Sequence, residues 1–227
     1  FREPLFITMT VNDGLTPGGG GEVIPYAQPI YLQSYNPTFA TIVGNVIDGG
    51  APGGFIGVAS LSKATISGNF IMGYRVGVDL YPDARNPLFP PNAGTVIDSN
   101  VILTRHSLND PIPLAYGIQS YGPKEIIFNN LIITPASFRF VGVALRGADS
   151  WVEANTVLPM QVMRQSYEVN WRSVGIGIGL SSTGSTAAAN RTYGLDVGIG
   201  PEEAYQIIPH RVISHFSTND VLAIDPR

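Results

Sequence analysis

The sequence predicts an all-β fold, a right-handed parallel β-helix of roughly six to eight rungs. Two short phrases recur along the chain and alternate with each other, and each reads as a short strand ending at a turn. Glycine and proline together make up 44 (26 plus 18) of the 227 residues, while only 13% of residues are charged. A repeated strand–turn unit with few charges is typical of a solenoid built from stacked strands.

The first phrase reads apolar, any residue, small, asparagine, any residue, apolar. Its five copies span 42–47, 66–71, 97–102, 127–132 and 152–157, and their asparagines are Asn45, Asn69, Asn100, Asn130 and Asn155. We interpret each copy as two strands joined at the asparagine, which tolerates a left-handed bend, with the small residue fitting the crowded interior. One copy cannot bury its own apolar side, so the copies are expected to stack about 4.8 Å apart, with the asparagines forming a hydrogen-bonded ladder.

The second phrase is a triplet with a central glycine that falls between copies of the first. Its copies span 56–58, 76–78, 116–118, 141–143 and 174–176. A further similarity links residues 32–37 with 118–123, and each of these segments leads into an asparagine phrase. An antiparallel sandwich would also have short strands, but it gives no reason for an asparagine to recur at one register.

On these phrases, residues from about 30 to 180 resemble the pectate-lyase-like superfamily of right-handed parallel β-helices. That superfamily includes polysaccharide lyases, pectin-type hydrolases, uronan epimerases and phage tailspikes. The resemblance concerns the fold alone. It implies that a substrate, in those members that are enzymes, lies along an outward strand face.

The two ends of the chain differ from the repeats. Residues 1–29 are expected to form an entry segment with an apolar strand at 5–11, residues 30–186 the β-helix, and residues 187–227 a cap. Pro201, followed by two glutamates, predicts a short helix in that cap. The chain starts without an initiator methionine or a signal peptide, which is consistent with a piece of a longer protein.

Composition excludes several classes of partner and site. The net charge is −4 and the basic residues are scattered, which argues against nucleic-acid binding. The apolar runs are too short to span a membrane, and without cysteine there is neither a disulfide nor a thiolate metal site. The three histidines, His106, His210 and His215, do not have metal-ligand spacing, and the glycosylation triplet at Asn190 is near chance frequency. So few charges predict a surface covered by Ser, Thr, Asn and Gly and partly buried against partners, and we expect an extracellular, cell-surface or virion location.

Counting outward positions from the glycine phrases predicts one exposed patch. Two residues past the glycines lie Asp79 and Gln119, and four residues past them lie Tyr81, Tyr121 and Arg146; Gln33 and Tyr35 are the expected equivalents one rung earlier. Aromatic rings stack on sugars, while Asp, Gln and Arg bind hydroxyls or a uronate carboxylate. The alternative is ordinary stacking of similar residues on neighbouring strands. Two long loops, 82–92 and 104–114, are expected to wall the patch.

An enzyme would place its chemistry on this patch. The candidate catalytic residues are Asp79, Arg146, His106 and Asp110. A lyase would require calcium bound by carboxylates and a basic residue, and a hydrolase two carboxylates about 5–9.5 Å apart. The outward acids Asp98 and Glu153 are separated by Phe128, which predicts a spacing of about 9.6 Å.

The low charge, the expected outward apolar residues Phe128, Leu61 and Val43, and the lack of a carboxylate cluster favour a structural or recognition module that self-associates and displays a surface, with polysaccharide as a second partner. The alternatives are a polysaccharide lyase or hydrolase acting on a uronic-acid glycan and a glycan binder without catalysis. No cofactor is expected, apart from calcium in the lyase case.

Overall fold

The computed structural model describes residues 30–32, 40–49, 54–60, 63–80, 93–105, 114–134, 140–160, 173–179, 182–195, 197–201, 215–218 and 221–223. These residues form β-strands and short turns, and no helix occurs among them. The strand pairs are parallel except for the last two strands. The predicted all-β class with parallel sheets is therefore confirmed.

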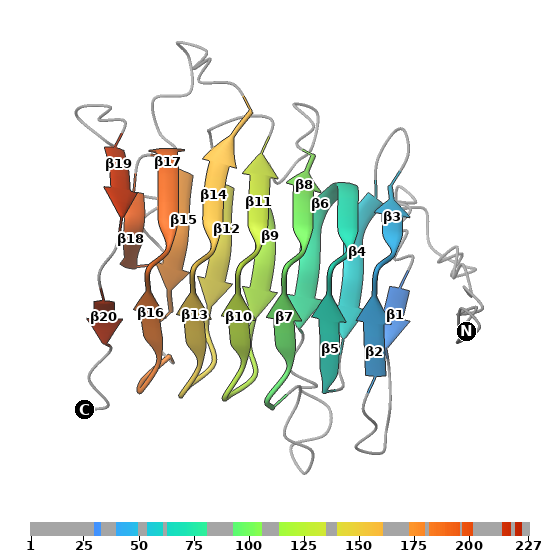
Figure 1. Cartoon of the computed structure of the whole chain (residues 1–227), viewed down its shortest axis with the longest axis horizontal. Coiled ribbons are helices and arrows are strands. Elements are labelled where there is room, and N and C mark those ends of the chain that lie inside the picture. Colours follow the sequence, from blue (N-terminus) through green and yellow to red (C-terminus); the bar gives the residue numbers. More distant parts are fainter. Residues whose placement is uncertain are drawn as a thin grey trace, which may run out of the picture.

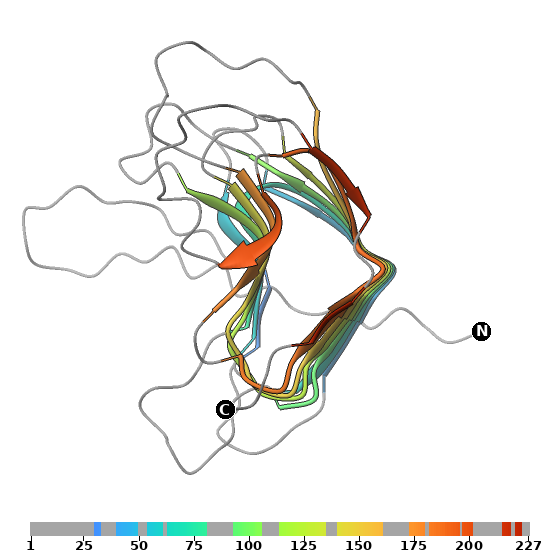
Figure 2. The same cartoon turned by 90° about the vertical axis from the view of Figure 1, so that its left-hand side faces the viewer.

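The strands form three stacks, which Figure 2 shows nearly end-on. Stack one contains β2 (Ala40–Val43), β5 (Ala64–Ser67), β7 (Val96–Asp98), β10 (Ile126–Phe128), β13 (Trp151–Glu153) and β16 (Thr186–Ala188). Stack two contains β3 (Val46–Asp48), the first part of β6 (Phe70–Leu80), β8 (Val101–Thr104), β11 (Leu131–Thr134), β14 (Thr156–Pro159) and β17 (Arg191–Leu195). Stack three contains β1 (Ile30–Leu32), β4 (Gly54–Ser60), the second part of β6, β9 (Ala115–Ser120), β12 (Phe140–Leu145), β15 (Ser173–Ile178) and β18 (Val197–Pro201).

The chain visits the three stacks in turn and then returns to the next place in stack one, as the colour order in Figure 1 shows. The first circuit is β2–β3–β4 and the sixth is β16–β17–β18. Strand β6 passes from stack two to stack three without a break, and bends at Gly73, where φ is 80°. Its first part pairs with β3 and β8, and its second part with β4 and β9.

The C-terminal end changes from parallel to antiparallel pairing. β19 (His215–Thr218) pairs with β17, and β20 (Val221–Ala223) pairs with β16. The predicted helix start at Pro201 is wrong. Gly200 and Pro201 are the last residues of strand β18, which pairs in parallel with β15. Residues 197–199 are a further copy of the glycine phrase, so the strand signal there prevails over the helix-start signal. Residues 202–214 and the predicted entry strand at 5–11 lie outside the described residues, and the segment boundaries at 29 and 186 stay predictions.

The glycine phrase marks a close approach between stacks two and three. A Cβ atom added to Gly117 would lie 2.4 Å from Cγ2 of Ile132 and 2.5 Å from the carbonyl oxygen of Gly142. A Cβ atom added to Gly77 would likewise contact Ile102, and one added to Gly142 would contact Val157. Glycine recurs at this register because a branched side chain from stack two fills the space that its own side chain would occupy.

A column of asparagines, buried except for Asn45 in the first circuit, forms the corner between stacks one and two. In every asparagine except the last, the backbone N–H and Nδ2 both donate to Oδ1 of the asparagine in the next circuit, at 2.9–3.0 Å. The column contains the five predicted asparagines and a sixth, Asn190. Sequence reasoning missed Asn190 because alanines and a threonine replace the usual flanking aliphatic residues. Since Asn190 is fully buried, its glycosylation triplet is closed off in the folded chain.

The left-handed residue at this corner is the one before the asparagine, which corrects the prediction that the asparagine itself takes that conformation. The φ angle is 69° at Gly44, 54° at Ser99, 55° at Asn129 and 53° at Ala154. These residues are exposed, so the expectation that the small residue fits the interior is also wrong. The left-handed turn points the following side chain, the asparagine, inward.

A second polar column stands at the start of the stack one strands, five residues before each asparagine. Its members are Ala40, Ala64, Thr95, Glu125, Ser150 and Ser185. Their hydroxyls accept backbone N–H groups from the preceding circuit: Glu125 donates to Ser150 at 3.1 Å, and Ser150 to Ser185 at 2.9 Å. Left-handed residues again come first, with φ of 59° at Lys124 and 54° at Asp149. At Thr95, Glu125, Ser150 and Ser185 the second corner therefore has the same arrangement as the first, a left-handed residue followed by a buried side chain.

Glu125 is the one acid in this second column. Its side chain is fully buried and accepts hydrogen bonds from the Gly122 N–H at 3.0 Å and from the Ser120 hydroxyl. Burial raises the pKa of Glu125 well above its usual value, although the Gly122 N–H acts in the opposite direction.

Candidate functional site

The patch predicted from the glycine phrases lies on stack three. Ala59, Asp79, Gln119, Ala144 and Gly177 pair in that order, which matches the predicted register. The extension to one earlier rung is wrong, because Tyr31, rather than Gln33, pairs with Ala59. The similarity of residues 32–37 to 118–123 predicts that Leu32 pairs with Val58. In the structure Ile30 pairs with Val58, so the register is shifted by two residues. Gln33 and Tyr35 lie outside the described residues.

Asp79 and Gln119 are buried, which corrects the prediction that they are exposed. Asp79 is 2% exposed and Gln119 8%. The other outward residues of stack three form a second apolar cluster, separate from the interior core: Ile56, Ala59, Val76, Leu114, Tyr116, Val141, Ala144 and Val174. The sequence could not show this, because strand alternation tells which face a residue is on but not whether that face is covered.

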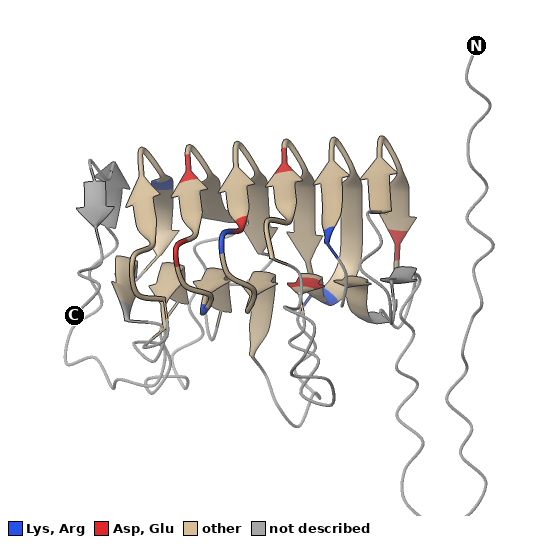
Figure 3. Ribbon diagram, turned by 90° about the horizontal axis from the view of Figure 1, so that it is seen from below, with Lys and Arg blue, Asp and Glu red and all other residues tan. Residues whose placement is uncertain are grey.

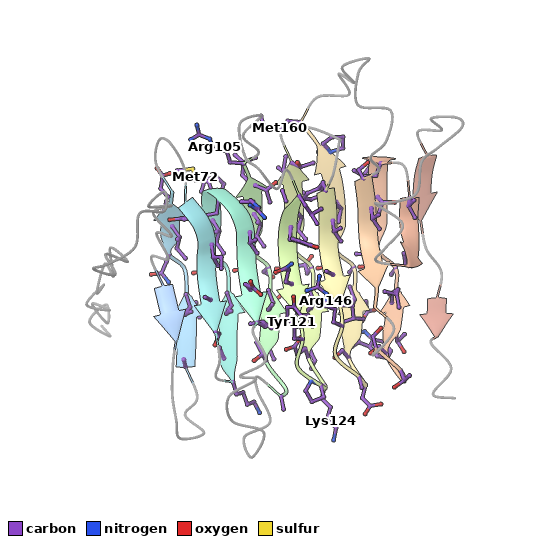
Figure 4. The ribbon with its side chains drawn as sticks, turned by 180° about the vertical axis from the view of Figure 1, so that it is seen from behind. Met72, Arg105, Tyr121, Lys124, Arg146 and Met160 are labelled. Carbon is purple, nitrogen blue, oxygen red and sulfur yellow. The ribbon has the colours of Figure 1, made fainter. Side chains whose placement is uncertain are left out.

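Arg146 and Tyr121 come together as the register predicts. Arg146 follows β12 and Tyr121 follows β9, and Figure 4 shows their side chains close to each other. The Arg146 Cζ lies 4.4 Å from the centroid of the Tyr121 ring and 5.5 Å from that of Tyr116, within the range of cation–π contacts. Nη2 of Arg146 also donates to the Tyr116 hydroxyl at 3.3 Å.

Tyr116 is the residue of this cluster that sequence reasoning missed. It opens a glycine phrase at a position where the other copies have Ile56, Val76, Val141 or Val174. An aromatic residue with a hydroxyl at an otherwise aliphatic position is the signal that would have found it. The three side chains present a guanidinium and two aromatic rings, which are groups that bind carboxylates and sugar rings.

Of the remaining predicted site residues, some lie among the described residues and others do not. Tyr81, His106 and Asp110 lie outside the described residues, as do most of the two loops expected to wall the patch. Asp79 and Arg146 lie on β6 and just after β12, with β9 between these strands. Asp98 and Glu153 flank Phe128 on stack one, as predicted. The described part of the chain contains no group of three or more metal-ligating residues.

No protein-family model matches the chain, and no curated protein or solved structure shows significant similarity to it. Within the described ranges, no helix is long and apolar enough to cross a membrane.

A larger candidate surface lies on the outside of stack two, and we call it the apolar face. Alternate strand residues point outward here, while the residues between them, such as Ile102 and Ile132, are fully buried. The outward residues are Val46, Asp48, Phe70, Met72, Val101, Leu103, Leu131, Ile133, Thr156, Leu158, Arg191 and Tyr193. Val46 is 72% exposed and Phe70 37%, and the others are exposed or half-buried.

Among the outward strand residues of the apolar face, charge is confined to the two ends, while the exposed Arg105 directly follows β8. Asp48 lies on β3, at one end of stack two, and Arg191 lies on β17, at the other parallel end. Stack one differs, because its outward acids Asp98 and Glu153 lie on inner strands, where they accept hydrogen bonds from Ser67 and Trp151. Figure 3 shows how few strand positions are charged.

Proposed function

We propose that the chain is a right-handed parallel β-helix of the pectate-lyase-like kind that serves as an exported or virion-associated structural and recognition module. Three stacks visited in strict rotation support the solenoid, and connections between parallel strands of one sheet are right-handed in about 98% of cases. The charged fraction of only 13% is in keeping with an exported or virion protein whose surface is partly covered by partners.

The apolar face carries the proposal that the module self-associates. Leu103, Ile133 and Leu158 lie on three consecutive circuits and point away from the core. Monomeric proteins rarely expose large contiguous apolar patches, and burial of such a surface contributes about 25 cal/mol per Å². A second molecule covering this face would remove these side chains from water.

Sedimentation velocity over a concentration series, from about 1 to 100 μM, tests the proposal. The wild type is expected to associate as the concentration rises. Ile133→Asp is expected to weaken association at least about 10-fold, because it places a charge inside the interface. Ile126→Asp is the matched control, since Ile126 is an outward isoleucine of the same circuit on stack one.

Each outcome bears on the proposal. A wild type that stays monomeric across the series would contradict self-association. Equal weakening by both substitutions would place the interface elsewhere. Circular dichroism of each variant establishes that it is folded.

Glycan binding is a second candidate function, favoured by the contact of Arg146 with Tyr116 and Tyr121. We expect the double variant Tyr121→Ala, Arg146→Ala to lose at least about 10-fold in affinity for a bound uronan, because it removes a stacking ring and the guanidinium. Tyr193→Ala, a tyrosine on stack two, is the control. Unchanged binding by the double variant would contradict a glycan site here. Following the absorbance of newly formed double bonds in the same incubations tests the lyase alternative.

A further inference from the structure

We infer that two copies of the chain pack through the apolar face with their long axes antiparallel, around a two-fold axis that lies in the interface parallel to the strands. This inference rests on the proposed self-association and names its partner and its geometry. It is carried by the arrangement of residues on stack two.

The apolar face has the form of two columns that run along the molecule. One column begins with Val46 on β3 and reaches Arg191 on β17. The neighbouring column begins with Asp48 on β3 and continues through Leu103 and Ile133. The acidic end and the basic end therefore lie five strand spacings apart, or about 24 Å at about 4.8 Å per spacing.

A two-fold rotation can pack this face against the same face of a second copy in two ways that keep the strands of the two copies aligned. If the long axes run parallel, β3 meets the partner's β3, so Asp48 approaches the partner's Asp48 and Arg191 the partner's Arg191. If the long axes run antiparallel, β3 meets the partner's β17, and each Asp48 approaches the partner's Arg191. The second arrangement brings opposite charges together at both ends, and the first brings like charges together.

The antiparallel arrangement also matches the apolar centre of the face. Strand β8 then lies over the partner's β11, so Leu103 faces the partner's Ile133 and Val101 faces the partner's Leu131. Two sheets packed face to face lie about 10 Å apart with strands nearly aligned, a geometry in which such branched side chains interdigitate. A long arginine side chain at the rim spans this gap to an aspartate on the neighbouring column.

Cysteine cross-linking tests the geometry directly, because the chain has no cysteine of its own. Phe70 lies in the second circuit and Thr156 in the fifth, both in the column of Val46. In the antiparallel dimer these two positions face each other, whereas each lies about 14 Å along the axis, or three strand spacings, from its own counterpart. The test therefore uses full-length Phe70→Cys and Thr156→Cys proteins with a short bismaleimide.

The expected result is covalent dimer in an equimolar mixture of the two variants, and little or none with either variant alone. Efficient cross-linking of Phe70→Cys to itself would overturn the antiparallel arrangement in favour of the parallel one. If the wild type sediments as an oligomer but no cross-link forms in any combination, the apolar face is not the interface. A wild type that remains monomeric overturns the proposed function itself, so the two failures are distinguishable.

A charge exchange provides a second readout that does not require cross-linking. In the antiparallel dimer, Asp48→Lys and Arg191→Glu each weaken dimerisation several-fold, and the double variant returns toward the wild-type constant. In a parallel dimer each single variant replaces one like-charge pair by another and changes little. If Asp48→Lys folds poorly, Arg191→Glu and the double variant are sufficient to distinguish the antiparallel from the parallel dimer.

Discussion

The two corners of stack one solve the same structural problem with different side chains. At the corner with stack two, every circuit has a left-handed residue followed by asparagine. At the start of the strands, a left-handed residue precedes Thr95, Glu125, Ser150 and Ser185, and the side chain at this position varies among alanine, threonine, glutamate and serine. An asparagine amide donates to the asparagine of the next circuit and accepts from that of the previous circuit. The same residue type can therefore occupy this position in every circuit. The hydroxyls of Ser150 and Ser185 accept a backbone N–H and donate to backbone carbonyls, so they do not bond to one another along the column and different residue types serve at this position.

We therefore expect the asparagine corner to be the less tolerant of the two. In Asn130→Ala, the Asn100 backbone N–H and Nδ2 both lose their acceptor, and the Ile97 carbonyl loses a donor. The free energy of unfolding should fall by about 3–5 kcal/mol, because buried polar groups are left unpaired. Urea denaturation measures the change. Asn129→Ala, at the adjacent exposed position, is the control and should cost less than about 1 kcal/mol.

The matching change at the second corner should have a smaller effect. Ser150→Ala removes the acceptor of the Glu125 N–H, but alanine already occupies this position at Ala40 and Ala64. A loss of about 1–2 kcal/mol is expected in the same denaturation assay. A loss as large as that of Asn130→Ala would show that the two corners are equally demanding and would remove the distinction.

Glu125 makes the second corner sensitive to pH. Burial raises the pKa of Glu125 in the folded protein, so the folded chain retains a proton that the unfolded chain releases. Its contribution to stability is complete below the unfolded pKa and is lost as the pH rises toward the folded value. Glu125→Gln should remove this decline and make the protein more stable than the wild type at neutral pH. Parallel stability–pH curves for the two proteins would contradict this interpretation.

The smallest expected effects concern the left-handed residues. Ala154 has φ of 53°, a conformation unfavourable for alanine, so Ala154→Gly should stabilise the protein by about 0.5–1 kcal/mol. Gly68→Ala is the reverse change, at φ of 61° with open space around the added Cβ, and should cost about 1–2 kcal/mol. Thermal unfolding measures both changes. If the two had the same sign, backbone strain would not be the cause.

The asparagine column could be predicted from the sequence, but the second column at the start of the stack one strands could not. Five asparagines at one register, with glycine triplets between them, predicted the parallel strand stacks and the order Asp79, Gln119, Ala144. Thr95, Glu125 and Ser150 keep the same spacing, but their side chains differ, so no recurring letter marks them. Asn190 was missed for a similar reason, since its flanking residues depart from the phrase.

The candidate site was less predictable than the fold. Strand alternation placed Tyr121 and Arg146 together, but it gave no information on coverage, and so Asp79 was expected to be exposed. The apolar face was also overlooked, because outward residues were counted on stack three and not on stack two. Reading the residue after each asparagine, from Val46 and Phe70 to Leu131, would have revealed it.

An experimental structure of the associated wild-type protein tests the central claim most directly. The account predicts a right-handed winding, six asparagine amides within hydrogen-bond distance along one column, and the apolar faces of two antiparallel copies in contact. A structure in which stack two faces solvent, or in which the asparagine side chains point away from the column, would contradict it.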